Sequence, residues 1–163
     1  MKVLLGLMML FSLNAGATTV SPLTYDVGFS TGSYAGNSYS EMHLGLNWYF
    51  WEYFNWRNSA FTRSGKNVES ATGLDSSLRF ETRDDGADSI GYHIFAGPGF
   101  RFSSQSNSAY FAEAGSTLRL GGLSIGAGFK HLNYVRPGND STGAELPKGD
   151  TNVFLIIAGG GAL

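Results

Sequence analysis

The sequence predicts an all-β protein: an eight-stranded antiparallel up-and-down β-barrel that crosses a membrane with its strands. Three observations support this prediction. Apolar and polar residues alternate in eight short segments, the charged residues of those segments share one face, and the chain opens with the pattern of an export signal. Alternation with a period of two is how a strand sorts its side chains onto two faces.

Residues 1–17 have the pattern of a secretory signal peptide. Met1 and Lys2 form a basic start, residues 3–13 are apolar, and Ala15-Gly16-Ala17 is a small-residue ending of the kind that precedes cleavage. The apolar run is too short to cross ~30 Å of hydrocarbon as a helix. We therefore expect cleavage after Ala17, with residues 18–163 forming a single barrel domain.

Composition narrows the function classes. The chain has no cysteine, so disulfides and thiolate metal sites are excluded, and we expect no metal and no cofactor. The formal net charge of −2 gives a nucleic-acid partner no electrostatic support. The 23 glycines, 14% aromatic residues and only 4 prolines favour many short strands joined by tight turns.

The first four segments are 22–34, 41–50, 53–64 and 72–83. The residues on their more apolar face are Leu23, Tyr25, Val27 and Phe29; Met42, Leu44, Leu46, Trp48 and Phe50; Phe54, Trp56, Ala60 and Thr62; and Leu74, Ser76, Leu78 and Phe80. The third segment is the least regular. Short polar residues at 35–38 separate the first two segments.

The last four segments are 89–102, 108–119, 122–134 and 151–162. Their apolar face carries Ile90, Tyr92, Ile94, Ala96, Phe100 and Phe102; Tyr110, Ala112, Ala114 and Leu118; Leu123, Ile125, Ala127 and Phe129; and Val153, Leu155 and Ile157. The sequences Asp84-Asp85-Gly86 and Gly121-Gly122 are strong turn signals, and 135–149 is the one long connection.

The position of the charges indicates which face is inside. The apolar faces carry no Asp, Glu, Lys or Arg, whereas the opposite faces carry ten charged residues that predict an ion network in the barrel lumen. These are Asp26, Glu41, Arg57, Asp75, Arg79, Glu81, Arg101, Glu113, Arg119 and Lys130. A charge at the bilayer midplane costs a barrel ~2–4 kcal/mol, so the uncharged faces are expected to contact lipid.

A soluble exported barrel that binds a ligand is the alternative architecture, because its strands would show the same alternation with the apolar face inward. Two features favour the membrane. Residues 48–56 are rich in Trp, Tyr and Phe around one tight turn, as in an interfacial girdle. The apolar face also contains small residues such as Ala112 and Ala127, which lipid tolerates.

A periplasmic N-terminus predicts which connections lie on each side of the membrane. The connections at 35–40, 65–71, 103–107 and 135–149 are expected outside. The turns near 51–52, 84–88 and 120–122 are expected in the periplasm. This places the longest connection outside, as in other barrels of this kind.

The signal, the eight amphipathic segments and stretches such as Phe95-Ala96-Gly97-Pro98-Gly99-Phe100-Arg101-Phe102 resemble the small OmpA-like or opacity-like outer-membrane barrels. The resemblance covers essentially the whole chain after the signal and is one of pattern. It implies the outer membrane of a Gram-negative bacterium as the location.

One segment suggests chemistry. Lys130-His131-Leu132-Asn133, followed by Glu145, is similar to the last hairpin of outer-membrane lipid A 3-O-deacylases. The resemblance implies His131 as a base and Glu145 as its orienting acid. However, Asn133 stands where the family has its nucleophilic serine, and an amide cannot form an acyl-enzyme.

The remaining titratable residues are explained by packing. His43 and His93 lie in the inward register and are expected to form hydrogen bonds in the lumen. Asp75 and Glu81 flank Arg79, which favours an ion network over acid–base catalysis.

The sequence thus predicts a non-enzymatic, monomeric barrel with a lumen filled by side chains. Its partners are outer-membrane lipid and a possible extracellular ligand at loop 135–149. A lipid A-modifying enzyme and a soluble ligand-binding barrel are the alternatives.

Overall fold

The computed structural model of the chain describes residues 23–51, 53–82, 90–104, 108–121, 123–137 and 145–159. The expected signal peptide, residues 1–17, and the turn signal at 84–86 lie outside these ranges. Within them, no helix is long and apolar enough to cross a membrane.

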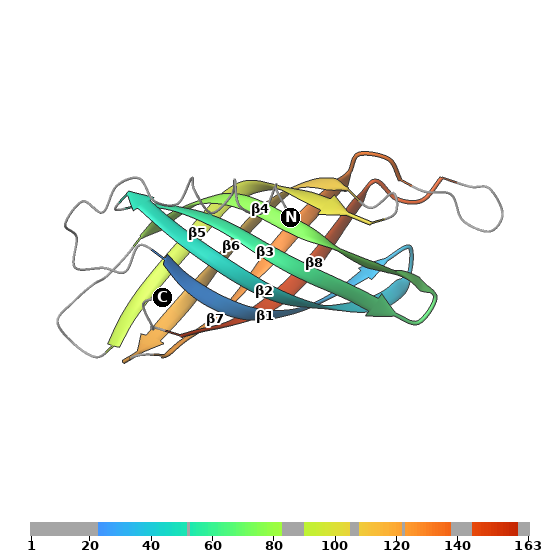
Figure 1. Cartoon of the computed structure of the whole chain (residues 1–163). Helices are drawn as coiled ribbons and strands as arrows, with labels where there is room; N and C mark the ends of the chain where they lie inside the picture. Colours follow the sequence, from blue (N-terminus) through green and yellow to red (C-terminus); the bar gives the residue numbers. More distant parts are fainter. Residues whose placement is uncertain are drawn as a thin grey trace, which may run out of the picture.

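Eight antiparallel strands follow one another in chain order and close into a barrel (Figure 1). They are β1 (Leu23–Tyr34), β2 (Asn37–Trp51), β3 (Phe54–Gly65), β4 (Val68–Thr82), β5 (Ile90–Ser103), β6 (Ala109–Leu120), β7 (Leu123–Tyr134) and β8 (Gly149–Gly159). β1 pairs with both β2 and β8, which closes the sheet. The predicted all-β class, strand number and up-and-down order are confirmed.

The strands are strongly staggered. A path that starts at Phe54 in β3 and follows paired residues once around the barrel returns to β3 at Ser64, ten residues further along the strand. Stagger and tilt are linked in a barrel, and eight strands leave an interior that side chains alone can fill. The interior of this barrel is therefore a packed core.

Two of the predicted loops are tight turns. β2 begins at Asn37 and β4 at Val68. Only Ala35-Gly36 therefore connects β1 to β2, and only Lys66-Asn67 connects β3 to β4. Ala35 and Gly36 have φ of 50° and 78°, the left-handed conformation of a two-residue hairpin turn. The connections expected at 35–40 and 65–71 were too long. The strands continue into these ranges, but their outward residues there are mostly hydroxyl residues in place of apolar ones.

Candidate functional site

The structure places nine of the ten predicted network residues in the barrel interior, each no more than 6% exposed. Arg119 is half-buried. Two further charged residues, Arg63 and Asp150, are also buried in the interior. The alternation that places Arg57 inward also places Arg63 inward, so Arg63 could have been predicted from the sequence. Asp150 was missed because β8 begins at Gly149, earlier than the predicted 151.

Arg101 is the centre of the ion network. Its guanidinium donates two hydrogen bonds to Asp75, at 2.7 and 2.8 Å, and two to Glu41, at 2.7 and 3.1 Å. Arg63 donates to the same Glu41 carboxylate at 2.7 Å. Lys130 lies 2.8 Å from Asp75. These contacts join residues of five strands, so the network ties distant parts of the wall together.

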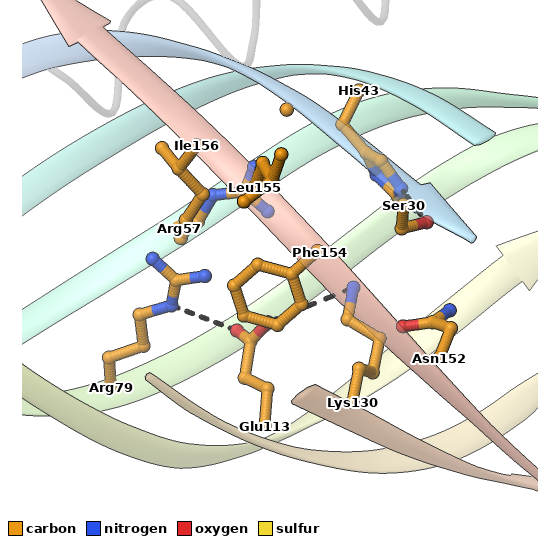
Figure 2. Close-up of a pocket in the computed structure, with 11 residues that line it drawn as sticks. Ser30, His43, Arg57, Arg79, Glu113, Lys130, Asn152, Phe154, Leu155 and Ile156 are labelled. Atoms are coloured by element: carbon orange, nitrogen blue, oxygen red, sulfur yellow. Dashed lines mark hydrogen bonds and ion pairs between the residues drawn. The ribbon is translucent and has the colours of Figure 1, made fainter. Parts of the chain in front are cut away.

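A second group lies beside the first. Arg79 donates to Glu113 at 2.9 Å, and Lys130 lies 3.7 Å from the same carboxylate (Figure 2). Arg57 binds Asp26 through two nitrogens, at 2.6 and 2.9 Å. Arginine and carboxylate fit each other in this two-point geometry, which satisfies more donors than a single contact does. The predicted pairing of acids with bases in the lumen is thus a set of specific contacts.

The Asp26–Arg57 pair depends on a glycine. A Cβ added at Gly45 would lie 2.6 Å from an Asp26 carboxylate oxygen and 2.8 Å from Nη2 of Arg57. Both distances are shorter than real Cβ contacts, and both partners are held by the ion pair. Glycine at position 45 therefore provides the space in which the pair forms.

Aromatic rings complete the interior. The rings of Tyr39, Phe61, Phe95 and Phe111 each face a buried cation, at 3.9–4.4 Å from ring centroid to charge centre. Such a contact is favourable when it is desolvated. The sequence analysis did not identify these inward aromatic residues, because it expected charged residues on the inward face and apolar residues on the outward face.

The two inward histidines take part in the network as expected. Nε2 of His43 lies 3.1 Å from Glu41 and 3.4 Å from the Ser30 hydroxyl. Nδ1 of His93 lies 3.5 Å from Glu81, which also accepts a hydrogen bond from Asn55. No three His, Cys, Asp or Glu side chains gather in a metal-binding arrangement within the described ranges.

The cavity shown in Figure 2 lies between β8 and the charged residues of the facing strands. Its lining includes Ser30, His43, Glu113, Asn152 and Phe154, and its volume is only about 10 Å³. That volume holds about one water molecule. The cavity is too small for an organic ligand.

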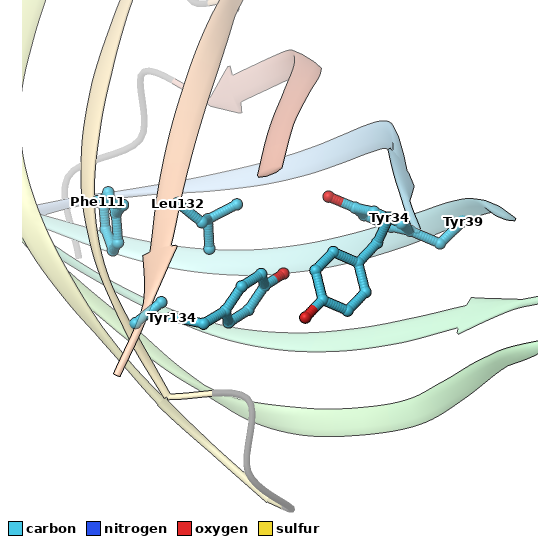
Figure 3. Packing of buried hydrophobic residues seen from close by; sticks show 6 residues of the cluster. Tyr34, Tyr39, Phe111, Leu132 and Tyr134 are labelled. Atoms are coloured by element: carbon cyan, nitrogen blue, oxygen red, sulfur yellow. The ribbon is translucent and has the colours of Figure 1, made fainter. Parts of the chain in front are cut away.

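A second cluster fills the end of the barrel where β1 joins β2 and β7 joins β8. Tyr34, Tyr39, Leu132 and Tyr134 pack together with Phe111 (Figure 3). The Tyr34 and Tyr134 ring centroids are 4.9 Å apart. We call this end of the molecule the loop end, because it also carries the long 135–148 connection.

Hydrogen bonds fix the tyrosines of the loop end. Tyr39 donates to the Asp150 carboxylate, Tyr134 lies 3.4 Å from the same oxygen, and Arg63 donates to the Tyr134 hydroxyl at 3.0 Å. These side chains fill the interior at this end of the barrel.

The structure does not bring His131 and Glu145 together. His131 is exposed on the outer wall, where its Nδ1 lies 2.8 Å from the Thr151 hydroxyl. Glu145 is exposed and pairs with Lys148 at 3.7 Å. Asn133 also faces outward and is exposed. The base and orienting acid implied by the deacylase resemblance thus have other partners.

The outer wall carries a continuous band of exposed hydrophobic side chains, which we call the apolar belt. Its larger members are Tyr25, Phe29, Met42, Leu44, Leu46, Phe50, Trp56, Leu74, Leu78, Phe80, Ile90, Tyr92, Ile94, Phe102, Tyr110, Leu118, Leu120, Leu123, Ile125, Phe129, Val153, Leu155 and Ile157. No described residue on the outer wall at the level of the belt is Asp, Glu, Lys or Arg. Asn58, Ser76 and Ser116 interrupt it with uncharged polar groups.

This distribution is the reverse of the one that a soluble ligand-binding barrel requires. Such a barrel keeps its apolar face inside, around the ligand. Here the buried side is charged and closely packed, and the exposed side is apolar. The soluble alternative expected the apolar face inside, whereas the described strands place it outside.

Aromatic side chains gather where β2 turns into β3, as the sequence predicted. Trp51 is 70% exposed, and Trp48 and Trp56 pack with a centroid distance of 5.8 Å. Tyr53 stacks on Phe80 at 5.8 Å. Large rings with polar edges are typical of the level at which lipid headgroups begin.

Comparisons with protein-family models, with curated proteins and with solved structures found no match to this chain.

Proposed function

We propose that this protein is a barrel of the outer membrane of a Gram-negative bacterium, with a structural or surface-interaction role. The apolar belt carries the proposal. An exposed apolar surface of this extent around a whole molecule is unfavourable in water, because soluble monomers rarely expose patches above a few hundred Å². In lipid, the same surface is the expected one.

The height of the apolar belt suits an outer membrane. On β2 it runs from Met42 to Phe50. Nine residues at ~3.3 Å per residue, tilted by ~40°, cover ~23 Å along the barrel axis. Outer-membrane barrels have an apolar band of ~25 Å between aromatic girdles. The aromatic cluster at the β2–β3 turn lies at one edge of the belt.

The interior favours an anchoring role over transport. Ion pairs, aromatic rings and the tyrosine cluster of the loop end fill the lumen, and the cavity of Figure 2 has room for about one water. A general diffusion pore needs a wider lumen than eight strands provide. Contact with the environment then falls to the loop end and the 135–149 segment, in a barrel that we expect to be monomeric.

Cell fractionation combined with gel mobility tests the proposal. The protein is expected in the outer-membrane fraction, resistant to extraction with sodium carbonate. It should also migrate differently before and after boiling, because a closed barrel stays folded in cold detergent. Recovery in the soluble periplasmic extract, with one mobility at both temperatures, would contradict the proposal.

A further inference from the structure

The first four strands extend beyond the apolar belt toward the loop end, and there each strand presents two outward serine or threonine residues. All eight side chains are exposed. We call them the hydroxyl collar: Thr31, Ser33, Ser38, Ser40, Thr62, Ser64, Ser70 and Thr72. Four neighbouring strands thus present a surface of one chemical kind, without a charged side chain among the eight.

The register places the collar hydroxyls in a regular array. Thr31 is paired with Ser40, Ser40 with Ser64, and Thr62 with Thr72. Paired residues of neighbouring strands are ~5 Å apart, and alternate residues of one strand are ~6.7 Å apart. Each hydroxyl can donate one hydrogen bond and accept two. Thr31 donates to the Tyr39 carbonyl, and the other seven hydroxyls have no side-chain partner among the described residues.

The collar is continuous with the apolar belt. On each strand the change occurs in a single outward step, for example from Met42 to Ser40 and from Ala60 to Thr62. A lipid whose acyl chains lie against Met42 and Ala60 must therefore place its headgroup against the collar. This step rests on the membrane location proposed above.

We propose that the hydroxyl collar binds the sugar headgroups of outer-leaflet glycolipids. The absence of charge selects this partner. A surface built for phosphate would present Arg or Lys, which bind phosphate through charge-assisted hydrogen bonds. An array of neutral groups that donate and accept matches the hydroxyl groups of a sugar, which also donate and accept. The exposed charges within the hairpin of β3 and β4, Lys66 and Glu69, have opposite signs and give no net attraction for an anion.

Lipid retention in detergent tests the proposal. The folded protein is mixed with equal amounts of dihexosyl diacylglycerol, phosphatidylcholine and phosphatidylglycerol with identical acyl chains, and the retained lipids are counted by native mass spectrometry. The wild type is expected to retain the dihexosyl lipid preferentially. Replacing three collar hydroxyls, in Ser40→Ala, Thr62→Val and Thr72→Val, is expected to lower this preference roughly five-fold, because several hydrogen bonds are lost together.

A matched control removes hydroxyls elsewhere on the outer wall. Ser116→Ala lies within the apolar belt and Thr82→Val lies at the opposite rim. This double variant is expected to keep the wild-type preference. Equal retention of the dihexosyl lipid and phosphatidylcholine by the wild type would show that the collar is only hydrated. A preference for phosphatidylglycerol, or the same loss in the control, would also overturn the proposal.

Bilayer insertion of the same samples, followed by heat-modifiable mobility, separates this inference from the proposed function. A wild type that inserts but shows no glycolipid preference contradicts only the proposal that the collar binds glycolipids. A folded barrel that does not insert contradicts both.

Discussion

Four of the buried cations, Arg63, Arg79, Arg101 and Lys130, lie between a carboxylate and an aromatic ring. In this arrangement the charge is neutralised on one side and the ring fills space on the other. Removing one member of a buried pair leaves its partner charged and without compensation, which costs more than the pair itself contributes. The interior is therefore expected to be sensitive to single substitutions.

Replacing Arg101 tests this sensitivity. Arg101→Met leaves both Asp75 and Glu41 short of donors, and we expect a loss of roughly 3–5 kcal/mol in the free energy of unfolding. Arg119→Met, at a half-buried position, should cost much less. Urea unfolding in detergent micelles measures both. Equal losses for the two variants would contradict a central role for Arg101.

The glycines of the lumen allow a second comparison. Gly45→Ala would force the added methyl against the Asp26–Arg57 pair, and we expect a loss of ~1–3 kcal/mol. Gly28→Ala, on the adjacent strand, meets its nearest atom at an ordinary 3.4 Å and should be close to neutral. Thermal unfolding of both variants distinguishes them, and an equal effect would show that space at position 45 is not limiting.

At the level of residues, the sequence could predict which side chains face inward but not their partners. Alternation, together with the charges that share one face, predicts that Asp26, Asp75 and Arg101 lie inside. That Arg101 joins Asp75 and Glu41, while Arg57 takes Asp26, depends on the stagger between strands. The long arginine side chains also cross the lumen, so sequence neighbours are seldom the partners.

At the level of strands, the outer wall changes from apolar to polar at the edge of the belt, and charge should be tolerated on one side of that edge only. Leu46→Arg places a charge in the middle of the belt, where we expect a loss of ~2–4 kcal/mol. Ser38→Arg places the same charge beyond the belt on the same strand and should have little effect. Unfolding in lipid vesicles measures the difference. A tolerated Leu46→Arg would argue against lipid contact at that position.

The sequence predicted the existence of all eight strands, and the errors lie at strand ends. β2 and β4 were expected to begin at 41 and 72, whereas they begin at Asn37 and Val68. The strand ends that were missed carry outward serines in place of apolar residues. A search for apolar alternation stops where the belt stops, although the backbone pairing continues to Ser38 and Ser70.

At the scale of the molecule, alternation by itself was compatible with two opposite barrels; the charges favoured one of them, and the closed structure shows which face is outside. The apolar face is outward over all eight strands, and the ionic face is inward and closely packed. The candidate catalytic residues His131 and Glu145 pair with Thr151 and Lys148 and not with each other. What distinguishes the loop end is a closed tyrosine cluster inside and a hydroxyl surface outside.

Contact between the apolar belt and lipid is the central claim, and the three tryptophans report on it directly. Trp48, Trp51 and Trp56 all lie on the outer wall near the β2–β3 turn. The folded protein is reconstituted in bilayers of phosphatidylcholine with or without brominated acyl chains, and tryptophan fluorescence is compared. We predict strong quenching by the brominated chains. Unchanged fluorescence of folded, vesicle-associated protein would contradict it.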